Sequence, residues 1–304
     1  MASRAAMAEA MVTAAKRGDA RVARAFVEAV ARALGGVRQA ELEQLIAAGD
    51  LAGAIALADR AWTTAAASWR RDVAGQLRDA LEAGAEAALV GRPQLAGAFD
   101  VTNPATVAVA ARTAAELVIR VTTEQRQAIR QAVVRAVRGL DPQRLARDLR
   151  ASLGLTARGE AALANFRARL EALRGEPPGT TIDTNLRRLS NRGLTAARVD
   201  DLVGRYRQRL INQRATVIAR TEVMAAVNEG QRQLWTQAAA AGTLDPTEVE
   251  RVWIVTPDEK LCPICEELDG ARASLDGKFP GDGGEGPPQH PNCRCTEGLV
   301  ALGT

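Results

Sequence analysis

All four cysteines and the only histidine of this 304-residue chain lie in one stretch near its end. Cys262 and Cys265 form a Cys-x-x-Cys pair, and His290, Cys293 and Cys295 follow after a glycine-rich loop. Thiolate and imidazole are ligands that Zn²⁺ prefers, usually four in a tetrahedron. Five residues compete for four places, so the sequence predicts a zinc site but leaves open which of His290, Cys293 and Cys295 stays outside it.

Three uses of these residues compete. A structural zinc would stabilise the loop at 277–288, which has few apolar residues, by on the order of 10 kcal/mol. Two disulfides would need an oxidising compartment, and no signal peptide points to one. A redox pair or a catalytic metal is the third alternative; a catalytic zinc wants a nearby carboxylate base, for which Glu266 and Glu267 are candidates. At the start of a short helix, these two acids are more simply explained as solvated.

The composition is that of a helical protein, because alanine and leucine dominate and aromatic residues make up only 3%. No apolar run reaches the roughly 18 residues that a membrane span needs. We therefore expect a soluble protein without a membrane span, made in a reducing cytoplasm.

The basic residues number 40, and only Lys16, Lys260 and Lys278 among them are lysines. An arginine bias suits phosphate binding, since the guanidinium forks onto phosphate, but it is also typical of a GC-rich genome. The net charge is only +4 and the basic residues form no cluster. Aromatic residues to stack on bases are few, which disfavours a nucleic-acid-binding surface.

Apolar spacing predicts a succession of helices and one confident strand. Start signals include Asn103-Pro104, a capping box at Thr122–Gln125, and Asp141-Pro142. We expect helices over about 1–35, 40–47, 50–90, 104–120, 122–138, 142–154, from Thr156 to the linker, and over 195–241 with a candidate break near Asn212. Strands are expected at 249–256 and, shorter, at 298–302.

The fold class that follows is mainly α. A multi-helix N-terminal region (1–98) and a central helical domain (99–175) precede a linker (176–184). A C-terminal helix then leads into a small α+β zinc-knuckle subdomain within 185–304. Trp62 and Trp69, seven residues apart on one helix face, are interpreted as core anchors. Alanine-rich faces bury little apolar area, so we predict N-terminal helices that stay partly mobile until docked on a partner.

The last long helix has a mixed face, with Thr221 and Asn228 among apolar residues. Buried polar groups need partners. One hypothesis is that these side chains bond to the backbone of the zinc subdomain. The alternative is that this edge of the helix is only half-buried.

A series of motifs in a fixed order resembles the phage head morphogenesis proteins, the minor head proteins similar to the Mu F protein and the minor head protein of phage SPP1. The resemblance covers about residues 99–298, and residues 1–98 match nothing that we can name. The residues that carry it are Phe99–Pro104, Glu124–Arg130, Gly154–Arg158, Ala219–Glu222, Ala226–Gly230, Trp253, Thr256, Asp258, Cys262-x-x-Cys265, Leu268–Gly270, Pro287-Pro288 and His290-Pro-x-Cys-Arg-Cys295.

The resemblance implies a structural protein of a tailed-phage virion or phage-like particle, present in few copies and associated with the portal. It implies a role in head assembly and in DNA packaging or ejection, with the portal protein and the major capsid or scaffold protein as partners. It implies no enzymatic activity, and it locates the protein in the phage head after synthesis in the host cytoplasm. The alternative is a zinc-containing nucleic-acid-binding module that contacts packaged DNA non-specifically. A metal-dependent hydrolase is a third, weaker hypothesis.

Overall fold

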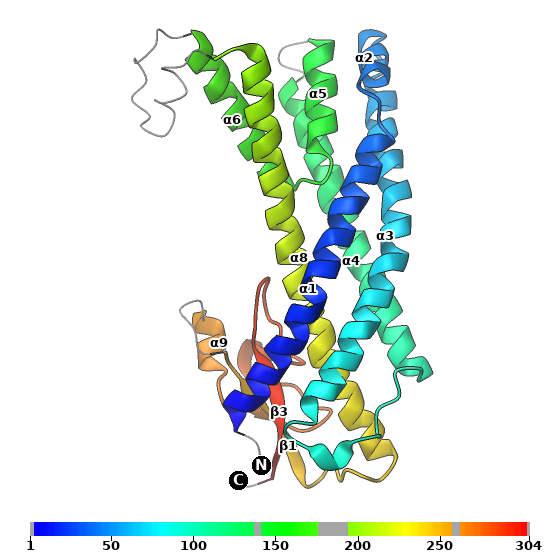
Figure 1. Ribbon diagram of the computed structural model, residues 1–304, viewed down its shortest axis with the longest axis vertical. Coiled ribbons are helices and arrows are strands. Elements are labelled where there is room, and N and C mark those ends of the chain that lie inside the picture. The colour runs from blue at the N-terminus through cyan, green and yellow to red at the C-terminus, as the bar shows by residue number, and fades with distance from the viewer. Residues whose placement is uncertain (1–2, 137–140, 176–193, 257–261, 303–304) are drawn as a thin grey trace. The chain divides into compact units, whose positions relative to one another are not determined.

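A computed structural model of the protein describes residues 3–136, 141–175, 194–256 and 262–302. The linker predicted at 176–184 lies outside these residues. The fold is mainly helical with one small sheet, as predicted (Figure 1). Its elements are α1 (Arg4–Gly35), α2 (Gln39–Ala47), α3 (Leu51–Ala88), η1 (Pro93–Leu95), α4 (Pro104–Ala136), α5 (Pro142–Ser152), α6 (Ala157–Gly175), α8 (Ala196–Ala240), β1 (Val249–Ile254), α9 (Pro263–Glu267), β2 (Arg272–Ala273), η3 (Gly281–Gly283) and β3 (Thr296–Ala301).

Three predicted helix starts are confirmed by their capping bonds. The side chain of Asn103 accepts from the amide of Ala105 at 2.9 Å, and that of Asp141 accepts from the amide of Gln143 at 3.0 Å. The Thr156 hydroxyl accepts from the amide of Gly159 at 3.1 Å. Each bond satisfies a backbone N–H that has no partner inside the helix.

Two predicted helix boundaries are wrong. Helix α4 runs through the capping box, because the hydroxyl of Thr122 accepts from the indole of Trp62 at 3.1 Å instead of capping. The side chain of Gln125 is likewise used elsewhere, accepting from the amide of Gly154 at 2.6 Å. Helix α8 is continuous past Asn212, which accepts a hydrogen bond from Gln208 one turn earlier at 2.9 Å.

The chain packs as two units, each assembled from segments that are distant in sequence. We call Met1–Phe26, Trp69–Leu117 and Ala215–Thr304 the sheet unit, and Val27–Ser68 and Val118–Arg214 the helical unit. The domain boundaries predicted at 98, 175 and 184 concern parts of the chain that are expected to fold independently, and they remain predictions. Among the described residues, no helix combines the length and the apolar character needed to cross a membrane.

In the helical unit, buried arginines satisfy the carbonyls at the end of α5. Arg207 donates to the carbonyls of Ala151 and Leu153 at 2.8 and 2.5 Å, and burial lowers its pKa to about 10. Arg214 donates to the carbonyl of Gly154 at 3.0 Å and pairs with Glu124 at 2.6 Å. Trp62 is fully buried in this unit, which confirms its predicted core role.

In the sheet unit, α3 and α8 approach closely enough for their backbones to touch. A Cβ placed on Gly230 would lie 1.8 Å from the carbonyl oxygen of Leu81, and one on Gly84 would lie 2.0 Å from that of Val227. Only glycine fits such contacts. Trp69 is fully buried beside Phe26, with ring centroids 5.4 Å apart, which confirms the second predicted core anchor.

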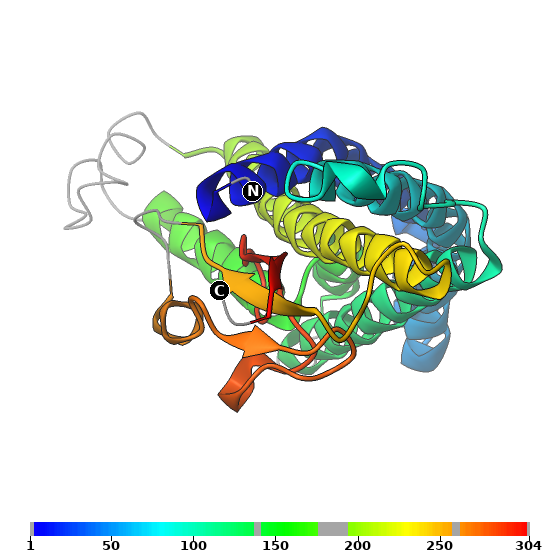
Figure 2. The same cartoon turned by 90° about the horizontal axis from the view of Figure 1, so that it is seen from below.

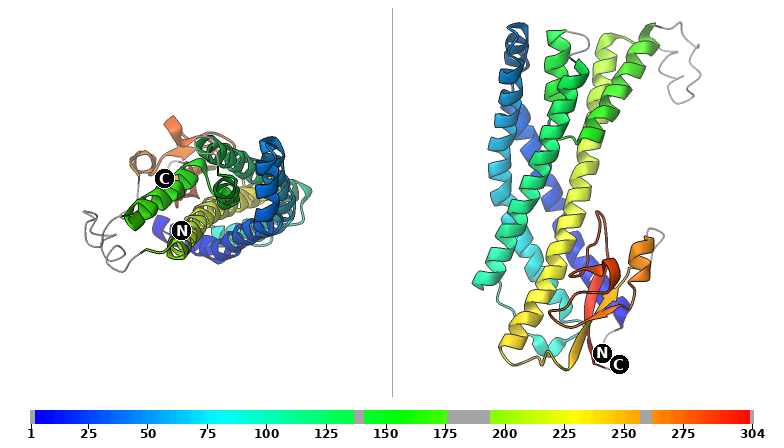
Figure 3. Two further views of the ribbon diagram at one scale, coloured as in Figure 1. Left: turned by 90° about the horizontal axis from the view of Figure 1, so that it is seen from above. Right: turned by 180° about the vertical axis from the view of Figure 1, so that it is seen from behind.

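The sheet has the order β2-β1-β3 and is antiparallel throughout (Figure 2). Strands β1 and β3 pair from Val249 opposite Ala301 to Ile254 opposite Thr296. The predicted strands are confirmed, although β1 ends two residues earlier and β3 starts two residues earlier than expected. The apolar residues of β1 and β3 pack in two clusters. Val252 and Ile254 pack with Met7 and Ala8 of α1, whereas Val249 and Leu299 pack with Ala85 of α3 and with Leu234 and Trp235 of α8. The right-hand view of Figure 3 shows the strands beside α1 and α8.

Candidate metal centre

Local turns position the two halves of the cysteine and histidine cluster. Cys262 caps α9, and its sulfur accepts from the amide of Cys265 at 3.4 Å, so both thiols lie on one side of a tight turn. In the second half, the amide of Cys293 donates to the carbonyl of His290 at 3.1 Å. Asn292 between them adopts a left-handed conformation with φ of 62°, which asparagine tolerates better than most residues. The chain then enters β3 directly after Cys295.

The structure brings all five candidate ligands together in two groups that share Cys265. One group is Cys262, Cys265 and His290, the other is Cys265, Cys293 and Cys295, and within each group the ligand atoms lie within 4.8 Å of one another. The Nε2 of His290 lies 3.1 Å from the sulfur of Cys262 and 3.3 Å from that of Cys265.

These distances suit zinc. Two thiolates at about 2.3 Å from a tetrahedral zinc lie about 3.8 Å apart, and the sulfurs of Cys265 and Cys293 are 3.8 Å apart. This separation is far longer than a disulfide bond of about 2.05 Å. All four cysteines are free thiols in the structure, so the disulfide alternative is not what the structure shows.

The orientation of His290 also suits a metal ligand. Its Nδ1 lies 2.9 Å from the carbonyl oxygen of Pro291, to which an Nδ1–H donates. The other ring nitrogen, Nε2, then carries the lone pair and faces the sulfurs of Cys262 and Cys265. Metal-binding histidines are commonly held in this way by a backbone carbonyl.

The crowded thiols ionise unequally. Burial raises the pKa of Cys265 to about 12. The hydrogen bond from the Cys295 thiol to Cys293 raises the pKa of Cys295 and lowers that of Cys293 to about 5. Cys265 and Cys295 therefore keep their protons more readily than Cys293. A metal bound to this cluster would need deprotonated thiols as ligands, and its positive charge would favour the thiolate form.

Helix α8 holds the second half of the cluster through buried polar side chains. Asn228 donates to the carbonyl of Cys295 at 3.1 Å, and its own side-chain oxygen accepts from the hydroxyl of Thr296 at 2.7 Å. Gln231 donates to the carbonyl of Glu297 at 2.8 Å. Two turns before Asn228 on α8, the hydroxyl of Thr221 accepts from the amide of Asn292 at 3.1 Å. The hypothesis that Thr221 and Asn228 bond to the backbone of the subdomain is therefore confirmed.

One buried ion pair, not expected from the sequence, organises the glycine-rich loop. Arg251 of β1 pairs with Glu297 of β3 at 2.9 Å, with side chains 3% and 0% exposed. The same guanidinium donates to the carbonyls of Ser274 and Glu285 at 3.1 and 2.8 Å, and also to that of Gly277. The loop is thus held by protein contacts as well as by any metal. The burial of Arg251 could have been predicted from the sequence, because side chains alternate along a strand and Arg251 shares a face with Trp253.

Two pairs of adjacent carboxylates, Glu266 with Glu267 and Asp200 with Asp201, are candidates for catalysis because paired carboxylates can act as acid and base. Glu266 and Glu267 are both exposed on α9. In the helical unit, Asp200 pairs with Arg167 at 2.7 Å, whereas Asp201 pairs with Arg205 at 3.0 Å. The adjacent aspartates therefore point different ways, as expected for neighbouring residues on a helix.

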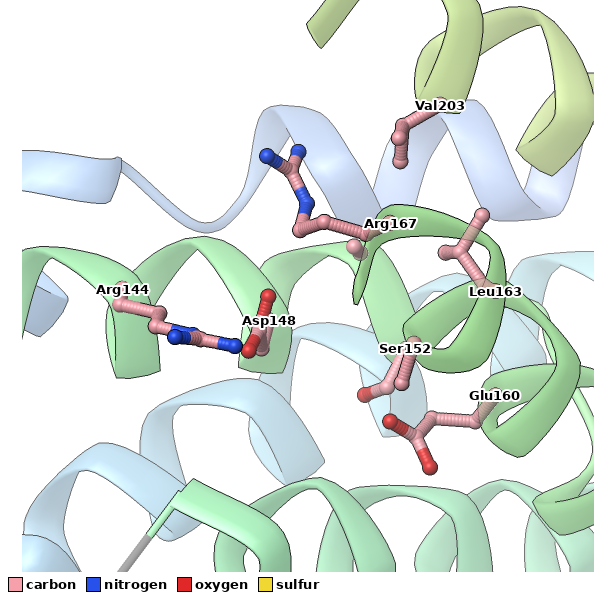
Figure 4. Close-up of a pocket in the computed structure, with 9 residues that line it drawn as sticks. Arg144, Asp148, Ser152, Glu160, Leu163, Arg167 and Val203 are labelled. Carbon is pink, nitrogen blue, oxygen red and sulfur yellow. The ribbon is translucent and has the colours of Figure 1, made fainter. Parts of the chain in front are cut away.

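A small cavity between α5, α6 and α8, lined by both charged and apolar side chains, has a volume of about 40 Å³ (Figure 4). Arg144 lies beside Asp148 in it, and Ser152 lies beside Glu160. A water molecule occupies about 30 Å³ of liquid. The cavity accordingly has room for a water molecule but not for a substrate.

Comparison with known proteins adds one finding. Residues 179–297 match the family model described as phage Mu protein F like protein. No curated protein and no solved structure matches the chain. The family resemblance inferred from the sequence is confirmed over this segment, which contains all five residues of the cluster.

Proposed function

We propose that the protein is a structural minor head protein of a tailed bacteriophage or a phage-like particle. It associates with the portal and acts in head assembly and in DNA packaging or ejection. The observation that carries this proposal is the match of residues 179–297 to the phage Mu protein F-like family. The matched segment contains β1, α9 and β2 and ends within β3, so it includes most of the sheet as well as the cluster.

The proposed metal is a structural Zn²⁺ held by Cys262, Cys265, His290 and Cys293. The close approaches of His290 to the first two sulfurs and of Cys293 to Cys265 support this set. Cys295 takes the role of a thiol that donates to the Cys293 sulfur. The metal would cross-link α9 to the segment before β3, and both Glu266 and Glu267 have exposed side chains. The role that we propose for this metal is structural and not enzymatic.

The proposed location is the phage head near the portal, after synthesis in the host cytoplasm. The portal protein is the proposed main partner, with the major capsid or scaffold protein as a further one. Non-specific contact with packaged DNA is compatible with a net charge of +4.

The test is to co-express the chain with the portal protein encoded beside its own gene and to weigh the complex by native mass spectrometry. A defined complex with one zinc per copy of this chain is the expected result. If the chain binds zinc but forms no complex with the portal protein, the proposed association with the portal is wrong. In that case, an affinity for DNA that falls steeply with salt concentration would favour the nucleic-acid-binding module, because a protein that neutralises phosphates releases counterions.

A further inference from the structure

The sheet unit contains a cleft to which neither the candidate metal centre nor the proposed function assigns a role. Its volume is about 430 Å³, within the range of ligand pockets. Helices α1 and α8 form two of its walls, and the segment from His290 to Arg294 forms the third. We call it the α1/α8 cleft.

Three cations line this cleft and come from its three different walls. Lys16 belongs to α1, Arg220 to α8 and Arg294 to the metal-binding segment. Asp19 is the one carboxylate among the lining residues. The cleft therefore carries a net positive charge, and the side chains of Lys16 and Arg220 are exposed to an incoming molecule.

Asp19 gives the cleft a second requirement. Its Oδ1 is buried and has no hydrogen-bond partner within the described part of the chain. Burial raises the pKa of Asp19, although the charges of Arg220 and Lys16 oppose this. A buried acceptor left without a donor costs stability, because it has given up its hydrogen bonds to water. An incoming N–H group would remove that cost.

The floor of the cleft adds a third requirement. Ala15 and Met224 are buried apolar residues, and Val12 and Pro291 lie beside them. Among the described residues, no Phe, Tyr or Trp lines the cleft, and its one imidazole, that of His290, faces the sulfurs of Cys262 and Cys265 with its Nε2. The cleft therefore lacks the large aromatic side chains on which bases commonly stack. The occupant should therefore present an apolar group rather than a nucleobase.

Three classes of group are thus needed together: an anion for the cations, an N–H donor for Asp19 and an apolar side chain for the floor. A phosphodiester backbone supplies only acceptors, and Asp19 would repel it. A peptide with an acidic and an apolar side chain supplies all three groups. We propose that the α1/α8 cleft is a docking site for an acidic, partly apolar segment of a protein partner. The inference rests on the proposed function, in which this chain has protein partners in the particle.

The cleft shares a wall with the candidate metal centre. His290 lines it, and the amide of the neighbouring Asn292 is anchored on Thr221 of α8 at 3.1 Å. A metal on His290 and Cys293 would fix this wall from its other side. Chelation of the metal should therefore weaken binding in the cleft, even though no cleft cation is a ligand.

The test uses the purified 304-residue chain loaded with zinc and a displayed library of random peptides. Selected peptides should be enriched in Asp or Glu next to Leu, Ile or Val. A synthetic copy of a selected peptide, followed by fluorescence anisotropy, should bind the K16Q/R220Q variant at least about tenfold more weakly, because the charge complementarity is lost. R17Q is the matched control, since Arg17 is exposed next to Lys16 but does not line the cleft. Its affinity should not change.

Several outcomes would overturn the inference. They are no enrichment, enrichment without acidic residues, or peptide binding that K16Q/R220Q leaves intact. The same would follow if the double variant lost binding to a single-stranded DNA oligonucleotide while keeping the peptide. Peptide selection involves no portal protein, so its failure is distinguishable from failure of the portal complex. Both substituted residues are exposed, and circular dichroism verifies that the variants fold.

Discussion

The side chain of Asn228 spans the point where the cysteine segment becomes a strand. Its amide nitrogen donates to the carbonyl of Cys295 at 3.1 Å, and its oxygen accepts from the hydroxyl of Thr296 at 2.7 Å. The residue is fully buried. Both polar atoms of the Asn228 side chain thus bond to two consecutive residues, and α8 fixes the position of Cys295 through its backbone carbonyl.

Replacing Asn228 with leucine should destabilise the protein by about 1–3 kcal/mol, because the Cys295 carbonyl and the Thr296 hydroxyl lose a buried partner. Denaturant unfolding of the zinc-loaded protein measures this. Asn212→Leu is the matched control on the same helix, where the side chain is exposed; its effect should stay within about 0.5 kcal/mol. Equal effects of the two substitutions would contradict the role of Asn228.

The need for partners at Thr221 and Asn228 was predictable from the sequence, because the two residues recur with apolar neighbours on one helix face. The identity of the partners was not, since Cys295 lies 67 residues beyond Asn228. The wrong boundary at Thr122 has the same origin. A capping box is a local signal, and the indole of Trp62, 60 residues away, overrides it by taking the Thr122 hydroxyl into a tertiary bond.

The close approach of α3 and α8 was equally invisible in the sequence. A glycine inside a helix is expected to lower helix stability by about 1 kcal/mol relative to alanine. Nothing in the neighbouring sequence distinguishes Gly230 from Gly204 on the same helix. The structure separates them, because Gly230 faces the carbonyl of Leu81 and Gly204 faces open space.

The substitution Gly230→Ala should therefore destabilise the protein by several kcal/mol, or prevent α3 and α8 from packing, since the obstructing atom belongs to the backbone. Gly204→Ala should instead leave stability unchanged or raise it by up to about 1 kcal/mol, through helix propensity alone. Thermal unfolding of the two variants gives the comparison. A stable G230A protein would show that the two backbones do not touch.

Arginine at position 251 is expected to be irreplaceable by lysine. Its planar fork reaches Glu297 and the carbonyls of Ser274, Glu285 and Gly277, whereas a lysine ammonium cannot span them all. Arg251→Lys should cost about 2–4 kcal/mol by leaving buried acceptors without donors. Unfolding in urea measures the loss.

The control for that substitution is Arg272→Lys in the adjacent strand. Arg272 pairs with Glu250 at 3.1 Å, but its side chain is 39% exposed, and such exposed pairs contribute at most about 1 kcal/mol. The interpretation of Arg251 fails if both lysine variants lose the same small amount. Proteolysis between 274 and 285 should also accelerate in R251K only, since that loop loses its anchor.

Asp148 should give the helical unit a pH dependence that asparagine removes. Burial raises its pKa above the ordinary value of 3.8, despite Arg167 and Arg144 nearby (Figure 4). The folded state then binds the proton more tightly than the unfolded state, so this contribution to stability is complete below pH 3.8 and is lost as pH rises through the raised value. Relative to Asp148→Asn, the wild type should lose stability as the pH rises from about 4 through the raised pKa of Asp148. Parallel urea-unfolding profiles would contradict this.

Zinc content should separate Cys293 from Cys295. In the proposed set, Cys293→Ser removes a ligand beside Cys265, whereas Cys295→Ser removes only a thiol that donates to Cys293. C293S should bind zinc at least about tenfold more weakly, as expected when a four-ligand site loses a thiolate. C295S should keep one zinc per chain by atomic emission. A chelator should lower the unfolding temperatures of the wild type and of C295S by similar amounts. It should leave the unfolding temperature of C293S unchanged. The reverse pattern would exchange the two roles.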